Sequence, residues 1–526
     1  MAVQGAFMRG AVVLIIAGFI NKVIGFLYRI FAVRVVGPEG IGLYEMVIPV
    51  YSLILVVTTA GIPLAISKYV SEQVSLGNFR EARKIFWVAL GFLLCSGLVS
   101  VGVLWAFIPT LVGEILPDPR VYWCILTLSP TLFFTSISSA FRGYYQGLQN
   151  MVPPAIGQVV EQVIRVTVGI YFASKLLPYG IEYSVAGLAA GTMLGELLGL
   201  LVLALTFASH RKKQWKLFPL NYRQKISSTG NILMSLFAFA IPVSLSRLIN
   251  SLLLALQAIV IPLRLQVAGN TLRQATELYG QFSGIAISLL GLPTIITLSL
   301  ATTLVPATSE ALSKNDYQLL RSRTVKALQL SLIVGLPAGV VFYLLPEQLC
   351  SIIFNSPEAG IPLRILAIGC IFLYLSQTSS GILQGLGKVG ITLRNSAAGA
   401  VCNIALIYVL TAVPTYGIRG TAIAMDISWA LVALLNLCSV FYFTGISFSF
   451  GNFVAVPLVG SFLMGGVVYS LFQLIWAWTG DVIITTIGSL FAGGTAYFVY
   501  LLFSGTIKKD DLSKIPGIGP FLNSIY

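Results

Sequence analysis

Long apolar segments recur along the whole chain, with short polar stretches between them. Segments such as VVLIIAGFI (12–20) and SLLLALQAIVI (251–261) do not alternate apolar and polar positions, so they predict helices rather than the strands of a membrane barrel. An apolar helix of about 20 residues can cross the ~30 Å hydrocarbon core of a bilayer, and we predict about fourteen such helices. They lie near residues 11–35, 42–66, 85–108, 121–147, 153–174, 184–208, 231–258, 280–306, 325–346, 361–385, 393–413, 418–443, 452–476 and 482–504.

The composition agrees with this pattern. Of the 526 residues, 57% are hydrophobic and only 10% are charged, whereas a soluble domain carries about 25% charged residues. The longest polar stretch, near 209–230, is too short for a soluble domain. We therefore expect an all-α integral membrane protein. Its first span continues through Asn21, Lys22 and Arg29 without a small-residue cleavage site, so we do not expect it to be a cleaved signal peptide.

Cysteine and histidine are arranged without a metal-binding pattern. The six cysteines are scattered and form no CxxC pair, and His210 is the single histidine. This predicts neither a metal site nor a disulfide framework, and we expect no cofactor. The sequence also lacks GxxxxGK[ST], because GLGKVG (385–390) has neither the spacing nor the final Ser or Thr. No outer loop bears a paired-carboxylate motif, so we expect a protein that is not an enzyme.

The net charge of +14 follows a topological pattern. Lysine and arginine mark the cytoplasmic loops of membrane proteins. With the N-terminus inside, the cytoplasmic segments hold Arg9, Lys68, Arg80, Arg83, Lys84, Arg142, Arg211, Lys212, Lys213, Lys216, Arg223, Lys225, Lys314, Arg321, Arg323, Lys326, Lys388, Arg394, Lys508, Lys509 and Lys514. The opposite loops hold Arg34, Arg120, Lys175, Arg264, Arg273, Arg364 and Arg419. The asymmetry predicts two cytoplasmic termini and an even number of spans, and it accounts for the charge without a nucleic-acid partner.

The two halves of the chain resemble each other. YVSEQVSLGNFREAR (69–83) is echoed by ATSEALSKNDYQLLR (307–321), and FRGYYQGLQ (141–149) by SGILQGLGK (380–388), each at an offset of 238 residues (309 − 71 and 384 − 146). Each repeat would carry six spans, and an even number predicts parallel repeats with a substrate site between them. We predict an N-lobe (1–210), a basic cytoplasmic linker (211–230), a C-lobe (231–445), and spans 13 and 14 with a cytoplasmic tail (446–526).

A few ionisable residues fall inside predicted spans, where each costs at least ~2.5 kcal/mol by insertion scales and marks a functional hypothesis. Lys22 and Arg29 are seven residues apart and share a helix face, while Arg247 and Asn250 lie in the seventh span. A cavity lined by Lys22, Arg29 and Arg247 would suit a phosphate or diphosphate. Alternatively, Arg29 extends to the outer surface and Lys22 pairs with a carboxylate elsewhere.

The segment EQVIR (161–165) places two opposite charges in the fifth span. Glu161 and Arg165 are four residues apart, so they can neutralise each other on one helix face. Two interpretations stay open: a self-paired structural element, or a pair that opens during transport and frees Arg165 for an anionic head group. Further candidates for coupling or gating are Glu45, Glu196, Asp426 and Arg142.

Several sequence motifs, taken together, resemble those of one known family. They are RGYYQGLQNMVPP, QVVEQVIR, LPYGIEYSVAG, GELLGLL, GPEGIGLYEMVIPVYS and GIPLAISKYVSE. Together they resemble the stage V sporulation protein B family, a polysaccharide-transporter branch of the multidrug/oligosaccharidyl-lipid/polysaccharide (MOP) exporter superfamily. The resemblance implies two six-helix lobes around a central cavity, two further helices, alternating access, and outward movement of lipid II across the bacterial plasma membrane for the spore cortex.

The MurJ-type lipid II flippases are more distant relatives. Their first span carries the motif S-R-x-L-G-F, which NKVIGF (21–26) resembles with Lys22 at the first basic position. Tyr28 and Arg29 share the second basic position. Those flippases also use arginines in spans 2 and 8, and the corresponding spans here have none, which shifts our hypothesis for the head-group site to Arg247 and Arg165.

Two functions compete at this stage. The first is a flippase for an undecaprenyl-diphosphate-linked precursor, with lipid II or a lipid-linked oligosaccharide and membrane lipids as partners, alongside cell-wall synthesis enzymes. It would act as a monomer coupled to the membrane potential or to H⁺ or Na⁺. The second is a cation-coupled multidrug exporter, for which Glu45, Glu196 and Asp426 would supply acidic groups. A membrane-bound glycosyltransferase is disfavoured by the missing outer-loop acid motif and the even repeat.

Overall fold

The computed structural model describes residues 2–217, 227–446 and 451–506, and within these ranges it contains helices and turns but no strand. The predicted all-α fold class is therefore confirmed. The chain forms two compact units, Met1–Gly280 and Gln281–Tyr526. Part of the predicted linker (211–230) lies outside the described residues. So does most of the predicted cytoplasmic tail after the last span (482–504). The lobe boundaries follow the sequence repeat rather than compact packing, and they stay predictions.

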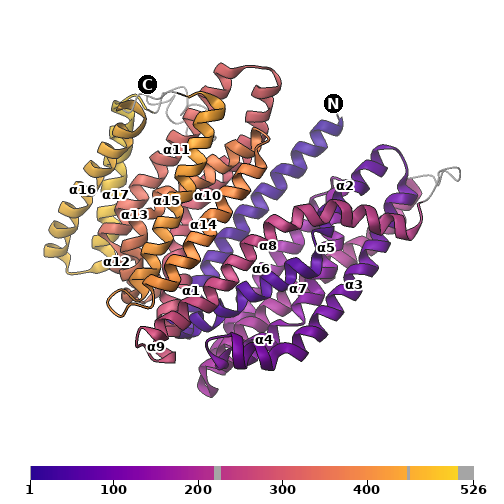
Figure 1. Ribbon diagram of the computed structural model, residues 1–526, viewed down its shortest axis with the longest axis horizontal. Helices are drawn as coiled ribbons and strands as arrows, with labels where there is room; N and C mark the ends of the chain where they lie inside the picture. The colour runs from indigo at the N-terminus through magenta and orange to yellow at the C-terminus, as the bar shows by residue number, and fades with distance from the viewer. Residues whose placement is uncertain (1, 218–226, 447–450, 507–526) are drawn as a thin grey trace. The chain divides into compact units, whose positions relative to one another are not determined.

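The first unit is built from nine helices in its described part (Figure 1). They are α1 (Ala2–Thr59), α2 (Ile62–Ser75), α3 (Phe79–Thr110), α4 (Tyr122–Leu128), α5 (Thr131–Gly147), α6 (Val152–Leu176), α7 (Ile181–Leu217), α8 (Thr229–Val267) and α9 (Leu272–Tyr279). The core lies where α2, α3, α5 and α7 meet. There the fully buried Phe86 packs its ring 5.3 Å from that of Phe141, 4.7 Å from Tyr144 and 5.1 Å from Phe207.

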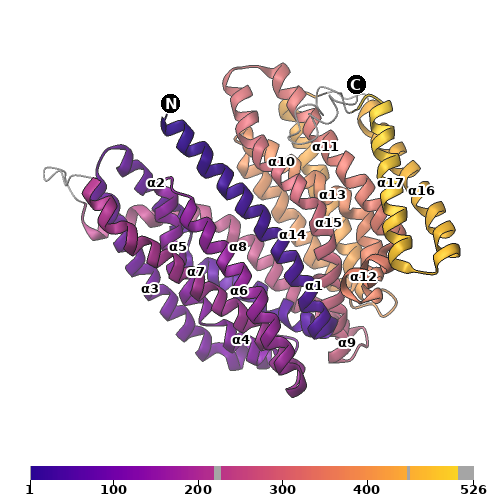
Figure 2. The same cartoon turned by 180° about the vertical axis from the view of Figure 1, so that it is seen from behind.

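The second unit contains eight helices in its described part. They are α10 (Ile287–Ser313), α11 (Tyr317–Leu344), α12 (Pro346–Phe354), α13 (Gly360–Gly385), α14 (Val389–Leu410), α15 (Ile418–Thr444), α16 (Val456–Thr479) and α17 (Val482–Phe503). Its core joins α10, α11, α13 and α15 through residues such as Leu304, Leu328, Ile382 and Val440. The paired helices α16 and α17 form one edge of this unit in both views (Figures 1 and 2).

The helices match the predicted spans closely. Twelve helical segments of the described chain are long and apolar enough to cross a membrane. One of them, Gly18–Ser75, holds the first two predicted spans, and α6, which carries the fifth, is not among the twelve. Fourteen is thus an approximate count, and the multi-pass helical membrane architecture is confirmed.

Helix α1 contains a sharp break that brings distant residues together. Gly37 has φ 68° and ψ 177°, outside the helical region, and Pro38 follows it. On a straight helix, Arg29 and Glu45 would be about 24 Å apart, because each residue rises about 1.5 Å. In the structure their side chains form an ion pair. The break at Gly37 therefore turns the chain back on itself, and it separates the first two predicted spans.

The sequence repeat is visible in helix packing. A Cβ on Gly143 would lie 2.5 Å from the Pro63 carbonyl oxygen, and a Cβ on Gly381 would lie 2.5 Å from that of Ala301. Both members of the second contact lie 238 residues after those of the first (381 − 143 and 301 − 63). The same offset links one further pair of contacts: Gly147 with the Ser67 oxygen (2.9 Å) and Gly385 with the Val305 oxygen (2.8 Å). Both units thus use the same glycine-mediated contact.

Candidate functional site

Four charged side chains from three helices meet within the first unit. Arg142 of α5 donates from Nη2 to Glu161 Oε2 of α6 at 2.8 Å, and Arg165 donates from Nη2 to Glu161 Oε1 at 2.6 Å. Glu196 of α7 approaches the same Arg142 nitrogen at 3.6 Å. We call these four residues the α5–α7 charge cluster. It contains the predicted Glu161–Arg165 pair, which is formed, and adds Arg142 and Glu196 to it.

Small residues on α7 make this meeting possible. Glycines recur at every fourth position of α7 and face α6: Gly187, Gly191, Gly195 and Gly199. A Cβ on Gly195 would lie 2.7 Å from the Glu161 carbonyl oxygen, and one on Gly191 would lie 2.8 Å from that of Arg165. Helix backbones can approach this closely only where side chains are absent. The glycine face therefore brings α7 against the turn of α6 that carries the charges.

The charges of the cluster balance, but their hydrogen-bonding capacity is not filled. The two carboxylates have side chains that are 8% exposed, and the arginine side chains are 21% and 22% exposed. Two arginines against two glutamates give no formal net charge, which lowers the cost of holding them at membrane depth. Among the described residues, Arg142 Nε, Arg165 Nε and Glu196 Oε2 are buried without a hydrogen-bond partner. The cluster can therefore offer donors to an anion.

A second polar group lies beside the break in α1. Arg29 pairs with Glu45 across the break. Close to the break, the Tyr44 hydroxyl lies 3.1 Å from Thr192 Oγ1 of α7. Farther along the first half of α1, Asn21 Nδ2 donates to Gln158 Oε1 of α6 at 3.2 Å. Both halves of α1 thus make polar contacts with the helices that carry the α5–α7 charge cluster.

The remaining residues that we predicted to line a cavity do not join the α5–α7 charge cluster or the polar contacts of α1. Lys22, Arg247 and Asn250 have exposed side chains. In the part of the chain that the structure describes, neither Lys22 nor Arg247 forms an ion pair. Arg29 has a carboxylate partner, so it does not stand as an unpaired cation. A cavity shared by Lys22, Arg29 and Arg247 stays a prediction.

The last predicted coupling residue, Asp426, lies in α15 of the second unit. Its side chain sits against Gly369 of α13, where a Cβ would come within 2.0 Å of Asp426 Oδ1. That oxygen is buried and has no hydrogen-bond partner among the described residues. A carboxyl group in such a place is stable in its neutral form, so it could bind a proton or a cation.

Sequence reasoning missed a third charge cluster in the first unit. Glu39 accepts from Arg120 Nη1 at 2.6 Å and from Arg273 Nε at 2.9 Å. Asp118, which is 0% exposed, accepts from Arg120 Nη2 at 2.7 Å and from the Thr276 hydroxyl at 2.8 Å. We call these five residues the α1–α9 latch. Its residues come from three separate segments, and only the turn motifs GPEG (37–40) and PDPR (117–120), which contain three of the five residues, could have signalled it.

The latch joins segments that the repeat assigns to different halves. Helix α9 lies between the seventh and eighth predicted spans, within the predicted C-lobe (231–445). It packs on α1 so closely that a Cβ on Gly42 would lie 2.1 Å from the Thr276 carbonyl oxygen. A Cβ on Gly280 would lie 1.9 Å from that of Pro38. In the first unit this contact lies at the end remote from the N-terminus (Figure 1).

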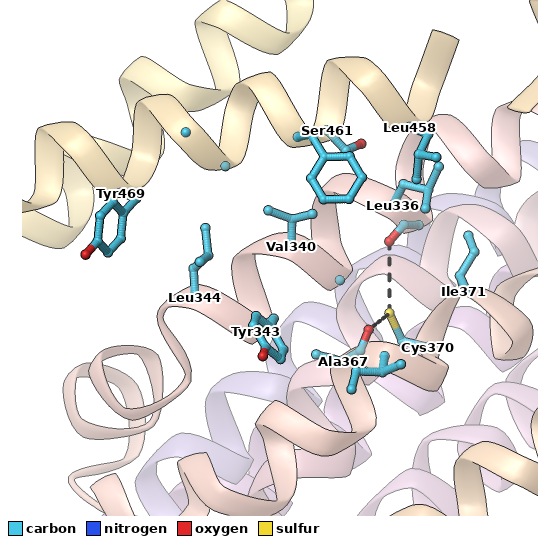
Figure 3. A pocket seen from close by; sticks show the side chains of 16 residues that line it. Leu336, Val340, Tyr343, Leu344, Ala367, Cys370, Ile371, Leu458, Ser461 and Tyr469 are labelled. Carbon is cyan, nitrogen blue, oxygen red and sulfur yellow. Dashed lines mark hydrogen bonds between the residues drawn. The ribbon is translucent and has the colours of Figure 1, made fainter. Parts of the chain in front are cut away.

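The second unit has an apolar pocket between α11, α13 and α16 (Figure 3). Its volume is about 630 Å³, and Leu336, Val340, Ile371 and Leu458 are among its lining residues. Cys370 lies at its wall and donates to the Ala367 carbonyl oxygen at 3.2 Å. The lining offers hydrocarbon contacts and little hydrogen bonding. Among the described residues no three His, Cys, Asp or Glu side chains gather as metal ligands.

The amino-acid sequence is similar to known families and to curated proteins. The sequence model of the polysaccharide biosynthesis protein family matches residues 7–312, and that of the MatE family matches residues 283–409. Stage V sporulation protein B of Bacillus subtilis is 32% identical over 98% of each chain. The lipid II flippase MurJ of the same organism is 26% identical over 76% of each chain.

The fold is also similar to a solved structure. A structure of the lipid II flippase MurJ in an inward closed conformation superposes with a TM-score of 0.71 at 15% identity, covering 93% of this chain and 98% of that one. At this identity the likeness shows a shared fold.

Proposed function

We propose that this chain, which belongs to the polysaccharide biosynthesis protein family within the MOP exporter superfamily, moves an undecaprenyl-diphosphate-linked peptidoglycan precursor of the lipid II type outward across the bacterial plasma membrane. Its place among flippases and transporters, with multiple transmembrane helices, follows from family membership. The lipid II substrate, the link to spore cortex synthesis, action as a monomer and the cytoplasmic location of both termini are parts of the proposal.

The α5–α7 charge cluster carries the proposal. Arg142 and Arg165 both donate to Glu161, and each has a buried Nε without a partner among the described residues. A diphosphate offers more acceptor oxygens than one carboxylate, and arginine binds phosphate through two parallel hydrogen bonds. In this mechanism the diphosphate takes the place of Glu161 between the two arginines. The resting cluster stays neutral, so the site costs little when it is empty.

The displaced carboxylates connect substrate binding with proton or cation binding. When a diphosphate holds the arginines, Glu161 and Glu196 lose their cationic partners in a poorly solvated place. Proton or cation uptake would then relieve their charge. Release of the substrate restores the ion pairs and returns the proton. This sequence links substrate binding to proton or cation binding at Glu161 and Glu196.

The apolar pocket is compatible with the other end of such a substrate. A polyprenyl chain can stay in the lipid, and the pocket between α11, α13 and α16 offers about 630 Å³ of hydrocarbon-lined space at the surface of the second unit. Burial of hydrocarbon there would contribute through the hydrophobic effect alone, since few polar groups line it.

The test is translocation of head-group-labelled lipid II in liposomes that hold the purified protein. We expect lipid II to cross faster than in protein-free liposomes, and a labelled phosphatidylcholine to show no such increase. Equal acceleration of both lipids would show an unselective scramblase and would contradict the proposal.

A second function has its own support. Glu196 and Asp426 each have a buried carboxylate oxygen without a hydrogen-bond partner among the described residues, and the MatE model matches residues 283–409. These features suit a cation-coupled multidrug exporter. In the same liposomes, export of a cationic dye with no lipid II translocation would establish that alternative.

A further inference from the structure

The second unit contains a small basic pocket that the proposed transport cycle does not use. It measures about 390 Å³ and lies between the first turns of α11 and the residues that follow α15. Arg321, Lys326 and Gln329 line one wall, and Gly445 with Ile446 lines the other. The α10–α11 turn and the end of α17 lie at this same end of the unit (Figures 1 and 2).

Local backbone geometry fixes one cation in the pocket. Helix α15 ends at Thr444, and Gly445 follows with φ 60°, which favours glycine. Arg321 Nε donates to the Thr444 carbonyl oxygen at 2.9 Å. A Cβ at position 445 would come within 2.8 Å of Arg321 Nη2, so the glycine also leaves room for the guanidinium. The helix end thus orients Arg321 through Nε, and this contact does not use the two Nη groups.

Arg321 and Lys326 also differ from the neighbouring basic residues in their ion pairing. Lys314 and Arg323, at the same helix end, both pair with Glu310, at 2.7 Å and 3.3 Å. Arg321 and Lys326 form no ion pair with any described residue, and no Asp or Glu lines the pocket. Two positive charges therefore share one recess without a counter-charge from the described residues. The missing partner is an anion.

The position of the pocket along α11 indicates which kind of anion it would bind. Beyond Lys326 the helix continues as the apolar segment ALQLSLIVGLPAGVV (327–341), so the pocket lies where polar and apolar parts of α11 meet. Tyr442 nearby is 83% exposed, as is usual for aromatic residues at a membrane interface. Val325 and Ile446 add apolar surface beside the cations. A ligand that combines a phosphate with hydrocarbon would satisfy both parts.

We propose that the pocket between α11 and the end of α15 binds the phosphate of an anionic phospholipid, with Arg321 and Lys326 as its cationic contacts. The bound lipid supplies a counter-charge that the described residues do not provide, and it ties the second unit to anionic lipid in its own leaflet. This site is separate from the α5–α7 charge cluster and does not depend on the transported substrate.

The experiment measures binding of fluorescent phosphatidylglycerol to the purified full-length protein in detergent, with fluorescent phosphatidylcholine as the neutral comparison. We expect wild type to prefer phosphatidylglycerol, and the double variant Arg321→Gln, Lys326→Gln to lose about tenfold in affinity for it. The charge-preserving double variant Arg321→Lys, Lys326→Arg should keep the preference for phosphatidylglycerol over phosphatidylcholine, since both cations attract a phosphate.

The matched control is the double variant Lys314→Gln, Arg323→Gln. It removes the same charge from the same helix end but leaves the pocket intact, so we expect less than about a twofold change in affinity. An equal loss in the control would show diffuse attraction and would overturn the site, as would equal binding of the two lipids by wild type. Displacement of the lipid by millimolar inorganic phosphate would show a site for free phosphate and would overturn the lipid assignment.

Discussion

At the scale of the residue, Glu161 decides the electrostatics of the α5–α7 charge cluster. It accepts from Arg142 at 2.8 Å and from Arg165 at 2.6 Å, so one carboxylate holds two guanidinium groups, while Glu196 approaches only Arg142, at 3.6 Å. Removing one partner of a buried ion pair leaves an uncompensated charge and costs about 3–5 kcal/mol. The same dependence makes the cluster responsive to a competing anion.

The pairing of Glu161 with Arg165 was accessible from the sequence, because residues four apart on a helix always lie on one face. The addition of Arg142 and Glu196 was not. These residues lie 19 and 35 positions from Glu161, and their approach depends on how α5 and α7 pack against α6. Periodicity gives the face of a helix but not its neighbour.

Asp426 gives a prediction at the same scale. Its buried Oδ1 has no hydrogen-bond partner among the described residues, so a proton or cation is its natural counter-charge. We expect Asp426→Asn to lower lipid II transport driven by an imposed ion gradient by about tenfold and to leave gradient-free exchange unchanged. Both rates are measured in the same liposomes.

Glu358→Gln is the control for this prediction, because Glu358 is an exposed carboxylate in the turn Pro357–Ala359. It should respond to the gradient as wild type does. A full gradient response by Asp426→Asn would remove Asp426 from the coupling mechanism.

At the scale of the element, close helix approach through glycine holds the site together. The four α7 glycines place α6 and α7 in near-backbone contact, and a Cβ at Gly191 would lie 2.3 Å from Gly169 Cα. Backbone atoms cannot move aside as a flexible side chain can. The spacing of these glycines is visible in the sequence, but their partner helix is not.

We therefore predict that Gly191→Ala destabilises the protein by about 1–3 kcal/mol through overpacking. Thermal unfolding of the detergent-solubilised protein measures the effect. The control is Gly102→Ala in α3, where a Cβ meets nothing within 4 Å. Alanine favours the helix over glycine by roughly 0.5–1 kcal/mol, so this control should be neutral or stabilising. Equal unfolding temperatures for the two variants would contradict the packing account.

The break in α1 is the element that sequence reasoning described least well. The sequence predicted two spans here, near 11–35 and 42–66, and Gly37 with Pro38 marks the junction. It did not predict that Arg29 would meet Glu45, because that pairing depends on the angle between the two helix halves. A backbone angle at one glycine thus changed the environment of a predicted cavity residue.

At the scale of the whole molecule, the internal repeat could be predicted from the sequence. Only some of the helix contacts could be predicted from that repeat. Sequence matches at an offset of 238 residues anticipated equivalent parts, and the Gly143–Pro63 and Gly381–Ala301 contacts show the equivalence in atoms. The α1–α9 latch was not anticipated, because its charges come from turns between predicted spans.

The latch leads to a prediction about alternating access. A cycle that separates the halves at this end must break the Glu39–Arg273 contact of 2.9 Å. We expect Arg273→Glu to repel Glu39, to loosen this end, and to raise labelling of a reporter cysteine by about tenfold, in a background without the native cysteines. The reporter is Thr276→Cys, because Thr276 is buried in the latch and cysteine is close to it in size. The measurement is the rate of reaction with a membrane-impermeant maleimide.

Arg364→Glu is the matched control, since Arg364 also pairs with a glutamate, at 3.3 Å, but lies in the second unit. It should leave the labelling rate of the cysteine at position 276 unchanged. Similar labelling rates for Arg273→Glu and its parent would show that the cluster is a static structural feature.

The central claim is that a diphosphate replaces Glu161 between Arg142 and Arg165, and the most direct test is the affinity for lipid II of three proteins in the same detergent. Arg165→Gln should weaken binding by about tenfold to a hundredfold, because a charge-assisted contact is lost. Glu161→Gln should strengthen binding relative to wild type, because the competing carboxylate is gone. Thermal unfolding with and without lipid II shows whether each variant is folded. Weaker binding by both folded variants would mean that the cluster only holds the helices together, and the account would be wrong.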